Sequence, residues 1–255
     1  MRYILYSILV FTSFFFLRED IKELKPTLGK LIDKSSEGEL KFNKHQAQCK
    51  LIWEKENQAG GYEKLSKEDK KIYDNCNSDE EDYWDILGSG CSWYCGGGLE
   101  KASSSSVLKP SKNNTYAASN LNDLNYKTAW IEGVPGYGIG QTIVYTFPPE
   151  NPRINKIIII NGYIKSKTAW EENSRVKRLK MYIDDKPYAI LNLADSRQEQ
   201  IFSVKLIGNS DRKDYEKLKL KPKWRMKFEI LEVYKGTKFD DTAISEIYFD
   251  GIDVH

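Results

Sequence analysis

The sequence predicts a mainly β protein, in which a β-sandwich follows a small α-helical region. Three observations support this prediction. After residue 98, short apolar segments recur with strand periodicity, and turn residues separate them. No helical pattern lies between these segments, which favours an all-β sandwich. Between residues 18 and 90 the chain is rich in Lys and Glu, and apolar residues recur at helical spacing. We therefore expect an N-terminal segment (1–17), a helical region (18–90) and a sandwich (91–255).

The expected strands differ in their apolar pattern. In residues 176–183 and 224–234 apolar and polar residues alternate, which predicts strands with one buried face. Residues 157–160 are four consecutive isoleucines, which predicts a central strand buried on both faces. Asp184 and Asp185 precede Lys-Pro and predict a hairpin turn. The eight expected strands cover residues 99–107, 141–147, 156–161, 176–183, 188–193, 201–206, 224–234 and 243–249.

The helical region is expected to contain two to four helices that dock onto the sandwich. Ile21, Leu24, Leu28 and Leu31 are spaced by three and four residues, and further helices are expected around residues 46–53 and 62–73. Ser66 precedes two acidic residues, as the N-cap of a helix does. Gly60 and Gly61 predict a break. A partly disordered stalk is the alternative.

The N-terminal segment and the overall charge limit the functional classes. Residues 1–17 have one basic residue followed by an apolar run shorter than the ~20 residues that span a bilayer. We expect a signal for export, cleaved or kept as an anchor, and therefore a secreted, periplasmic or envelope-associated protein. A hydrophobic N-terminal helix of the fold is the alternative. The net charge is only +2, so we expect no nucleic-acid partner, and membrane contact only through a retained N-terminal segment.

The cysteines and histidines also bear on function. Four cysteines in an exported chain favour two disulfides, and the simplest of three connectivities pairs Cys49 with Cys76 and Cys91 with Cys95. A zinc site of four thiolates and free buried thiols are the alternatives. Only two histidines, His45 and His255, are present. This scarcity argues against catalytic sites that use an imidazole base, and we expect no enzyme.

Several motifs of the sandwich region resemble one family. A small Ser run (103–106) precedes an Asn/Asp-rich loop that ends in Thr-Ala-Trp, and a Ser-Glu-Ile strand comes near the C-terminus. This order resembles the discoidin, or F5/8 type C, family of galactose-binding-like jelly-roll β-sandwiches. It is most similar to the glycan-binding domain that accompanies streptococcal NAD glycohydrolase. The resemblance covers roughly residues 91–251 and none of the glycohydrolase's catalytic half. The matching residues are Asn120, Leu121, Asp123, Thr128, Ala129, Trp130, Glu132, Gly133, Gly136, Gly138, Ile139 and Gly140.

The resemblance implies one structural calcium ion. Asp123, Asn125 and Thr128 offer oxygen ligands in the loop, and the resemblance implies that Glu246 joins them from the terminal strand. The chain has Asn122-Asp123-Leu124 where many relatives have Asp-Gly, so the turn is expected to differ. A network of Asx turns without a metal is the alternative.

The resemblance also implies a glycan ligand, bound by loops at one end of the sandwich. Sugars bind to an aromatic face and to polar hydrogen-bonding groups. Trp170, flanked by charged residues, is the most favoured contact. Trp130 is alternatively a core residue, and Tyr163 alternatively packs under its own loop. The expected ligand-binding residues are Trp130, Glu132, Tyr137, Tyr163, Lys165, Trp170, Asn173 and Arg175.

Other constellations favour no catalytic function. The glycines of residues 136–140 precede an expected strand rather than a helix, so a phosphate loop is not expected. The acidic pairs 171–172, 184–185 and 240–241 are sequence neighbours, which rarely face one glycosidic bond. We therefore expect a non-catalytic, glycan-binding protein. A module that binds a protein partner or an envelope component is the alternative.

Overall fold

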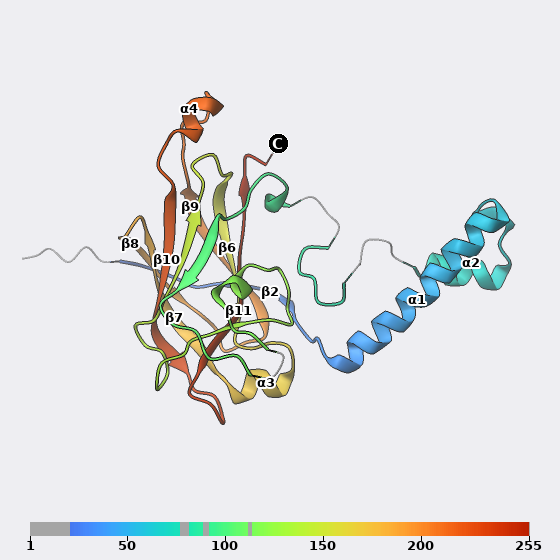
Figure 1. Ribbon diagram of the computed structural model, residues 1–255, viewed down its shortest axis with the longest axis horizontal. Coiled ribbons are helices and arrows are strands. Elements are labelled where there is room, and N and C mark those ends of the chain that lie inside the picture. The colour runs from blue at the N-terminus through green and yellow to red at the C-terminus, as the bar shows by residue number, and fades with distance from the viewer. Residues whose placement is uncertain (1–20, 77–81, 89–91, 112–113, 255) are drawn as a thin grey trace, which may run out of the picture.

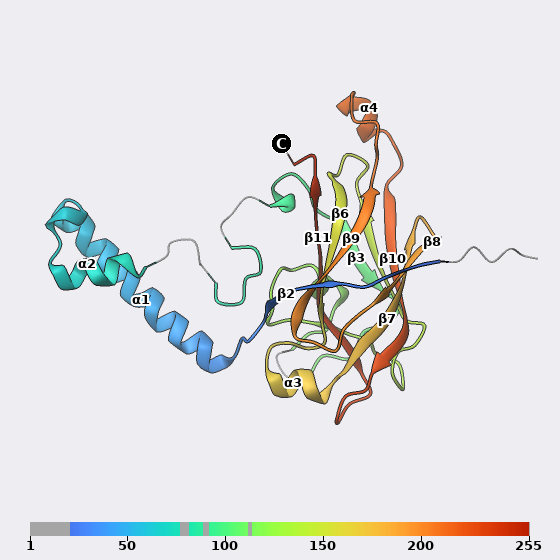
Figure 2. The same cartoon turned by 180° about the vertical axis from the view of Figure 1, so that it is seen from behind.

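The computed structural model describes residues 21–76, 82–88, 92–111 and 114–254. The expected export signal, Cys91 and His255 lie outside these ranges. The described part is a β-sandwich from which a helical arm projects (Figures 1 and 2). Within the described ranges, no helix is both long and apolar enough to cross a bilayer.

The described residues form eleven strands, which are hydrogen-bonded into one continuous sheet that folds into the two layers of the sandwich. One layer contains β2, β9, β6, β11 and the short β4, and the other contains β3, β5, β10, β7, β8 and β1. The layers join where β11 and β7 pair over two residues. All eight expected strands are present, with bounds within a few residues. The strands are β1 (Lys22–Leu24), β2 (Thr27–Leu31), β3 (Lys101–Ser104), β4 (Trp130–Ile131), β5 (Thr142–Phe147), β6 (Arg153–Asn161), β7 (Ser174–Ile183), β8 (Lys186–Asn192), β9 (Gln198–Ile207), β10 (Trp224–Tyr234) and β11 (Thr242–Ile252).

The main core lies between the layers and confirms the predicted alternation. Met226, Phe228 and Ile230 of β10 are fully buried, whereas the intervening Lys227 and Glu229 are partly exposed. The isoleucines of β6 are buried on both faces, as predicted. Ile157 and Ile159 face the main core, and Ile158 and Ile160 pack in a second apolar cluster around Trp84 and Tyr126.

The segment 21–31 corrects the sequence prediction, because it forms strands instead of a helix. β1 pairs in parallel with β8, and β2 pairs antiparallel with β9. Pro26 explains why a helix does not form, since inside a helix it lacks the N–H donor and clashes with the preceding turn. Leu28 and Leu31 are exposed on β2, so the helical spacing of these leucines does not correspond to a buried face.

The helical arm comprises α1 (Ser36–Ala59), the 3-10 turn η1 (Tyr62–Lys64) and α2 (Lys67–Asp74). α1 ends at Gly60, which adopts the left-handed conformation, and Ser66 caps α2 as predicted. The predicted Cys49–Cys76 disulfide joins α1 to the residues after α2. The start of the arm is fixed to the sandwich side by an ion pair between Glu39 and Lys127, 2.8 Å apart.

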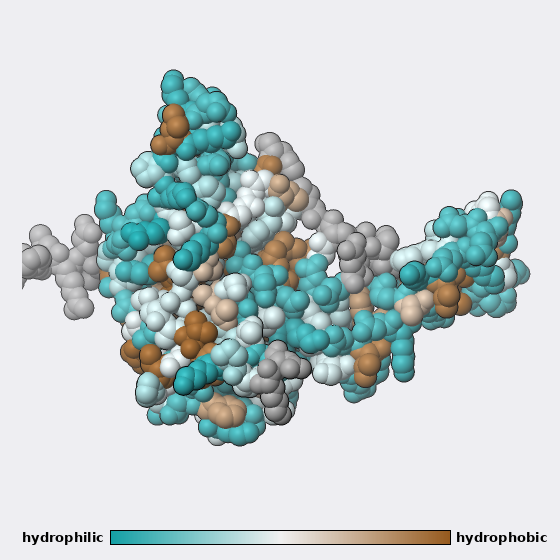
Figure 3. All heavy atoms as spheres, viewed as in Figure 1, coloured by the Kyte–Doolittle hydropathy of each residue, from teal (hydrophilic) through white to brown (hydrophobic). Residues whose placement is uncertain are grey.

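Loops at the two ends of the sandwich carry the remaining elements. The 3-10 turn η2 (Trp93–Cys95) precedes β3, and the 3-10 turn η3 (Ala118–Leu121) lies between β3 and β4. The helix α3 (Lys167–Glu172) lies at one end, and the helix α4 (Tyr215–Lys219) projects from the other (Figure 1). α4 lies in the charged segment between β9 and β10. Its tip is mostly hydrophilic (Figure 3), although Leu220 there is 85% exposed.

Two further local features follow the sequence. Asp184 and Asp185 both have positive φ, as in the hairpin turns that match strand twist. The C-terminal end is fixed by Arg153, whose guanidinium binds both carboxylate oxygens of Asp253 at 2.6 and 3.0 Å. This ion pair holds the pKa of Asp253 below its usual value.

Candidate functional site

A pocket of about 300 Å³ opens at the α3 end of the sandwich. Four separate stretches of the chain contribute to it: the loop before η3, the end of β4, the 162–173 segment and the loop before β11. Its floor is a small apolar cluster that includes Tyr116, Ile131 and Tyr163. The residues that line the pocket are Leu108, Ser111, Tyr116, Ile131, Tyr163, Lys165, Ala169, Glu172, Asn173, Phe239 and Asp241.

The pocket combines aromatic rings with polar groups of both charges. The rings of Tyr116 and Tyr163 meet edge to face, 6.3 Å apart between centroids. Phe239 is 39% exposed at the wall. The Lys165 ammonium lies 4.7 Å from the centre of the Tyr163 ring. This is the mixture of apolar faces and hydrogen-bonding groups that small polar ligands require.

Two carboxylates give the pocket wall an acidic character. Burial, and then the neighbouring Asp240, raise the pKa of Asp241. Glu172 is 3.3 Å from the Lys238 ammonium, which offsets its charge. Asn173 is buried, and its side-chain amide donates a hydrogen bond to the carbonyl of Ala169.

Only three of the eight expected ligand-binding residues line this pocket: Tyr163, Lys165 and Asn173. Tyr163 is only 6% exposed and packs partly under its own loop, the alternative considered above. Tyr137 is half-buried outside the pocket, with its carbonyl accepting a hydrogen bond from Thr242. Tyr116 and Phe239 were not predicted from sequence, because they come from loops distant in the chain, and Asp241 was considered only as a member of an acidic pair.

Trp130 and Glu132 are structural residues instead of ligand contacts. Trp130 has no exposed surface and packs in the main core, where its indole N–H donates to the carbonyl of Ser106. The Glu132 side chain is also fully buried, and it accepts hydrogen bonds from the backbone N–H groups of Val134 and Thr242. Both predictions were wrong for the same reason. The residue type of Trp130 and Glu132 suggests ligand contact, but at this end of the sandwich both side chains are buried and stabilise the fold.

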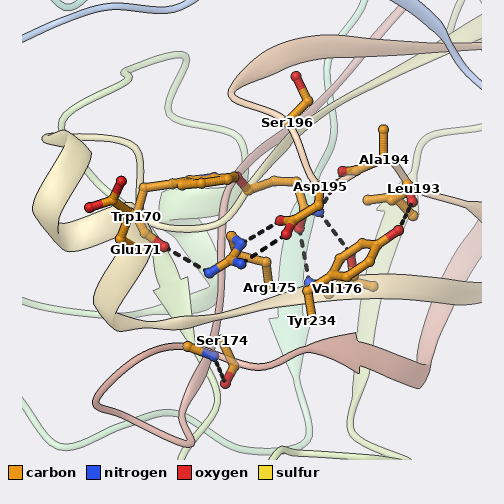
Figure 4. A network of polar contacts seen from close by, with 12 residues as sticks. Trp170, Glu171, Ser174, Arg175, Val176, Leu193, Ala194, Asp195, Ser196 and Tyr234 are labelled. Carbon is orange, nitrogen blue, oxygen red and sulfur yellow. Dashed lines mark hydrogen bonds and ion pairs between the residues drawn. The ribbon is translucent and has the colours of Figure 1, made fainter.

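Trp170 and Arg175 form a clamp that fixes α3 to β7 (Figure 4). The Arg175 guanidinium binds both carboxylate oxygens of Asp195, at 2.7 and 3.0 Å, and lies 4.3 Å from the Trp170 ring centre. The Trp170 indole N–H donates to the carbonyl of Asn161 at 2.9 Å. Trp170 is half-buried instead of exposed, and Arg175 is buried. Their polar groups are therefore engaged within the protein.

Close packing explains why glycine occupies positions 162 and 138. Gly162 has a φ of +84°, and an added Cβ would lie 2.7 Å from the Trp170 ring. Gly138 has a φ of +65°, and an added Cβ would lie 2.5 Å from the Glu132 side chain. In both cases a backbone turn comes so close to a structural side chain that only glycine fits without displacement.

The expected cation ligands Asp123, Asn125 and Thr128 lie together in the loop between η3 and β4. Thr128 donates its hydroxyl to both carboxylate oxygens of Asp123, at 3.0 and 2.7 Å. Asn125 directs its side-chain oxygen at the N–H of Lys127. The residue between, Leu124, has a φ of 58°, so the turn that lacks glycine adopts the left-handed conformation at some cost.

Glu246 is the distinctive member of this group. It is fully buried, and neither of its carboxylate oxygens has a hydrogen-bond partner among the described residues. Burial, followed by the charge of Asp123, raises its pKa well above the usual value. Backbone N–H groups of Asn125 and Leu124 oppose this rise but lie outside hydrogen-bond geometry. Two facing carboxylates, one of them buried with no hydrogen-bond partner in the described part of the chain, require a proton or a cation between them.

The fold and its end-loop pocket define a discoidin-like β-sandwich domain. Residues 93–250 match the family of NAD glycohydrolase translocation F5/8 type C domains. Because the match covers more than half of the chain, this protein belongs to that family. A comparison with curated proteins finds no match.

Solved structures of the CBM32 kind are similar at low identity. The CBM32-1 and CBM32-2 domains of Clostridium perfringens ZmpB align with 60% of this chain at 10% identity and a TM-score of 0.42. The same domains in complex with GalNAc align at 9% identity with the same TM-score. The family 32 carbohydrate-binding module of Streptococcus pneumoniae EndoD aligns at 11% identity, with a TM-score of 0.40, over 60% of this chain and 98% of the module. The aligned part is about a third of the ZmpB chains, 34% and 33%.

Proposed function

We propose that this protein is an exported, non-catalytic glycan-binding protein whose site is the pocket beside α3. The observation that carries the proposal is the convergence of the exposed Phe239 ring with amide, carboxylate and ammonium groups in one opening, above a floor that contains Tyr116 and Tyr163. An aromatic face binds the apolar side of a pyranose ring, and the polar groups bind its hydroxyls. Membership of a family of F5/8 type C domains supports the proposal.

The size and charge of the pocket narrow the ligand class. Its volume of about 300 Å³ is at the lower end for ligand pockets, which suits one sugar residue at the end of a glycan. Asp241, Glu172 and Lys165 all line the pocket, and Lys238 pairs with Glu172, so Asp241 is the lining acid without an ion-pair partner among the described residues. A neutral terminal sugar is therefore favoured, because a sialic acid would bring its carboxylate against these acids.

A glycan array tests this function. The purified chain should bind glycans that end in neutral sugars and bind poorly to their sialylated versions. The Asp241→Asn variant should lose affinity for the same glycans, since the amide replaces a charged acceptor of hydroxyl hydrogen bonds. Asp240→Asn, which changes the neighbouring acid outside the lining, is the matched control. Absence of binding by the folded chain would remove the proposal.

We further propose that calcium neutralises the acid pair. Asp123 and Glu246 would supply carboxylate oxygens, with Thr128 and Asn125 beside them, and hard oxygen donors suit calcium. The support is the buried Glu246 carboxylate, whose oxygens lack protein partners among the described residues. The ion would fix the loop to β11. A rise in unfolding temperature with calcium that is absent from Asp123→Asn tests this proposal.

Export is inferred from the apolar segment 1–17 and from the Cys49–Cys76 disulfide, because disulfides form in oxidising compartments. The Cys91–Cys95 pair stays a prediction, since Cys91 is outside the described residues. Fractionation of cells that express the full chain tests the localisation. Recovery of the protein in the cytoplasm with reduced thiols would contradict it.

A protein-binding role is the second candidate, and the projecting arm favours it. Leu40 and Leu51 on α1 are 62% and 67% exposed, in an arm that extends away from the sandwich (Figures 1 and 3). Exposed apolar side chains of this size are common in interfaces. Cross-linking of the chain on its producing cells, with and without a Leu40→Ser/Leu51→Ser double change, tests this role. Unchanged cross-linked products would refute it.

A further inference from the structure

The disulfide of the arm lies beside one of the two histidines of the chain. His45 and Cys49 are one helical turn apart on α1, so they lie on the same face. The His45 Nε2 atom is 3.6 Å from the Cys49 Sγ atom. Cys76 completes a group whose three ligand atoms all lie within 4.8 Å of one another.

The spacing of these atoms matches a tetrahedral metal site. Zinc binds thiolate sulfur at about 2.3 Å and imidazole nitrogen at about 2.0–2.1 Å, so the two ligand atoms of a tetrahedral site are about 3.6 Å apart. The His45–Cys49 distance has this value in the disulfide form. The Cα atoms of Cys49 and Cys76 are 5.5 Å apart, which leaves both sulfurs within reach of one ion.

Access and burial also suit a bound ion. Cys49 is fully buried, Cys76 is half-buried and His45 is exposed, so the group opens to solvent on one side. A metal can therefore enter past the histidine, and a water molecule can take the fourth position. Soft thiolates together with an imidazole favour zinc over calcium or magnesium.

We propose that the reduced arm binds one Zn²⁺ through His45 Nε2, Cys49 Sγ and Cys76 Sγ. The disulfide and the metal are then alternative cross-links between α1 and the residues after α2. In an oxidising compartment the disulfide holds the arm. Where a thiol reductant is present, zinc holds the same helices in place.

Replacement of the Cys49–Cys76 disulfide by zinc takes two steps, reduction and then metal binding. A dithiol reductant supplies two electrons and two protons, which break the sulfur–sulfur bond and give two thiols, and the reductant becomes a cyclic disulfide. Zn²⁺ then displaces both thiol protons into solvent and binds two thiolates. His45 binds as the neutral imidazole with its proton on Nδ1, so the contact of Nε2 with the Asn75 carbonyl, 3.1 Å away, is given up.

Cobalt titration of the full chain tests the proposal, because thiolate-bound tetrahedral Co²⁺ has distinctive visible and charge-transfer absorption. Cys91→Ser/Cys95→Ser serves as the background, which removes the other thiols. After reduction with a phosphine, one equivalent of Co²⁺ should bind, and one equivalent of Zn²⁺ should displace it. The oxidised chain should show no such absorption.

The decisive comparison is between two neighbouring changes on α1. His45→Ala should weaken Co²⁺ binding by at least about tenfold, since one of three protein ligands is lost. Lys44→Ala, one residue earlier and exposed, should leave it unchanged. Equal affinity of the two variants would overturn the assignment.

Circular dichroism covers the case in which reduction unfolds the arm. Recovery of helical signal on addition of Zn²⁺ to the reduced background, but not to its His45→Ala variant, is the expected result. A reduced chain that neither binds Co²⁺ nor regains helix with Zn²⁺ would overturn the proposal, whether or not its arm remains folded.

Discussion

Replacement of Glu246 by Gln removes the buried charge on which the calcium proposal depends. The carboxylate is fully buried beside Asp123 and lacks hydrogen-bond partners among the described residues. Without calcium, this charge opposes folding, so we expect Glu246→Gln to be at least as stable as the wild type. With calcium, only the wild type should gain stability.

The size of the gain follows from mass action. At a free calcium concentration of about 100 times the dissociation constant, binding to the folded state adds about 2.7 kcal/mol to the free energy of unfolding. For a domain of this size, that corresponds to a rise of roughly 5–10 °C in melting temperature. The variant keeps at most one carboxylate of the pair, so its rise should be below about 2 °C.

Thermal unfolding of chelator-treated protein, followed while calcium is added, measures this difference. Glu232→Gln is the matched control, because that half-exposed side chain pairs with Lys177. It should respond to calcium as the wild type does. Equal rises in the wild type and Glu246→Gln, or no rise in the wild type, would refute the reasoning.

Two further predictions concern stability. Gly138→Ala should lower the free energy of unfolding by about 2–4 kcal/mol, because the new Cβ would clash with Glu132 in addition to the cost of a positive φ. Gly136→Ala is the control: its φ is also positive, but no atom lies within 4 Å of the added Cβ. It should lower the free energy of unfolding by only about 1 kcal/mol. Chemical denaturation measures both, and equal losses would contradict the packing. Asp253→Asn should lose about 1–2 kcal/mol at pH 7, against less than about 1 kcal/mol for the more exposed Asp250→Asn. Because the pKa of Asp253 is lowered in the fold, this stabilisation is present above the ordinary value of 3.8 and is lost as the pH falls through the folded-state pKa. A difference between Asp253→Asn and wild type that persists in acid would contradict it.

The sandwich could be predicted from sequence because the order of apolar and polar residues in each strand reflects which of its faces are buried. The alternation in β10 and the isoleucine run of β6 depend only on which faces are buried. The segment 21–31 could not be assigned in this way. Its leucines fit a helical spacing, but they lie in short strands where neither Leu28 nor Leu31 is buried.

The candidate site was only partly predictable, because residue type does not reveal orientation. Trp and Arg side chains often bind ligands, but here Arg175 packs against the Trp170 ring and forms an ion pair with Asp195. The pocket depends on Tyr116 and Phe239, which the fold brings together from loops more than a hundred residues apart. The expected cation ligands were indicated by family resemblance, whereas the burial of Glu246 without a hydrogen-bond partner among the described residues became visible only in three dimensions.

Calorimetric titration of the best array glycan into the Phe239→Ala variant tests the central claim most directly. Phe239 is 39% exposed at the pocket wall, so its removal should not disturb the core. Loss of its ring contact should weaken binding by about tenfold. Tyr215→Ala, an exposed aromatic on α4 at the opposite end of the sandwich, should bind as the wild type does. Unchanged affinity in Phe239→Ala, or an equal loss in both variants, would contradict a glycan site beside α3.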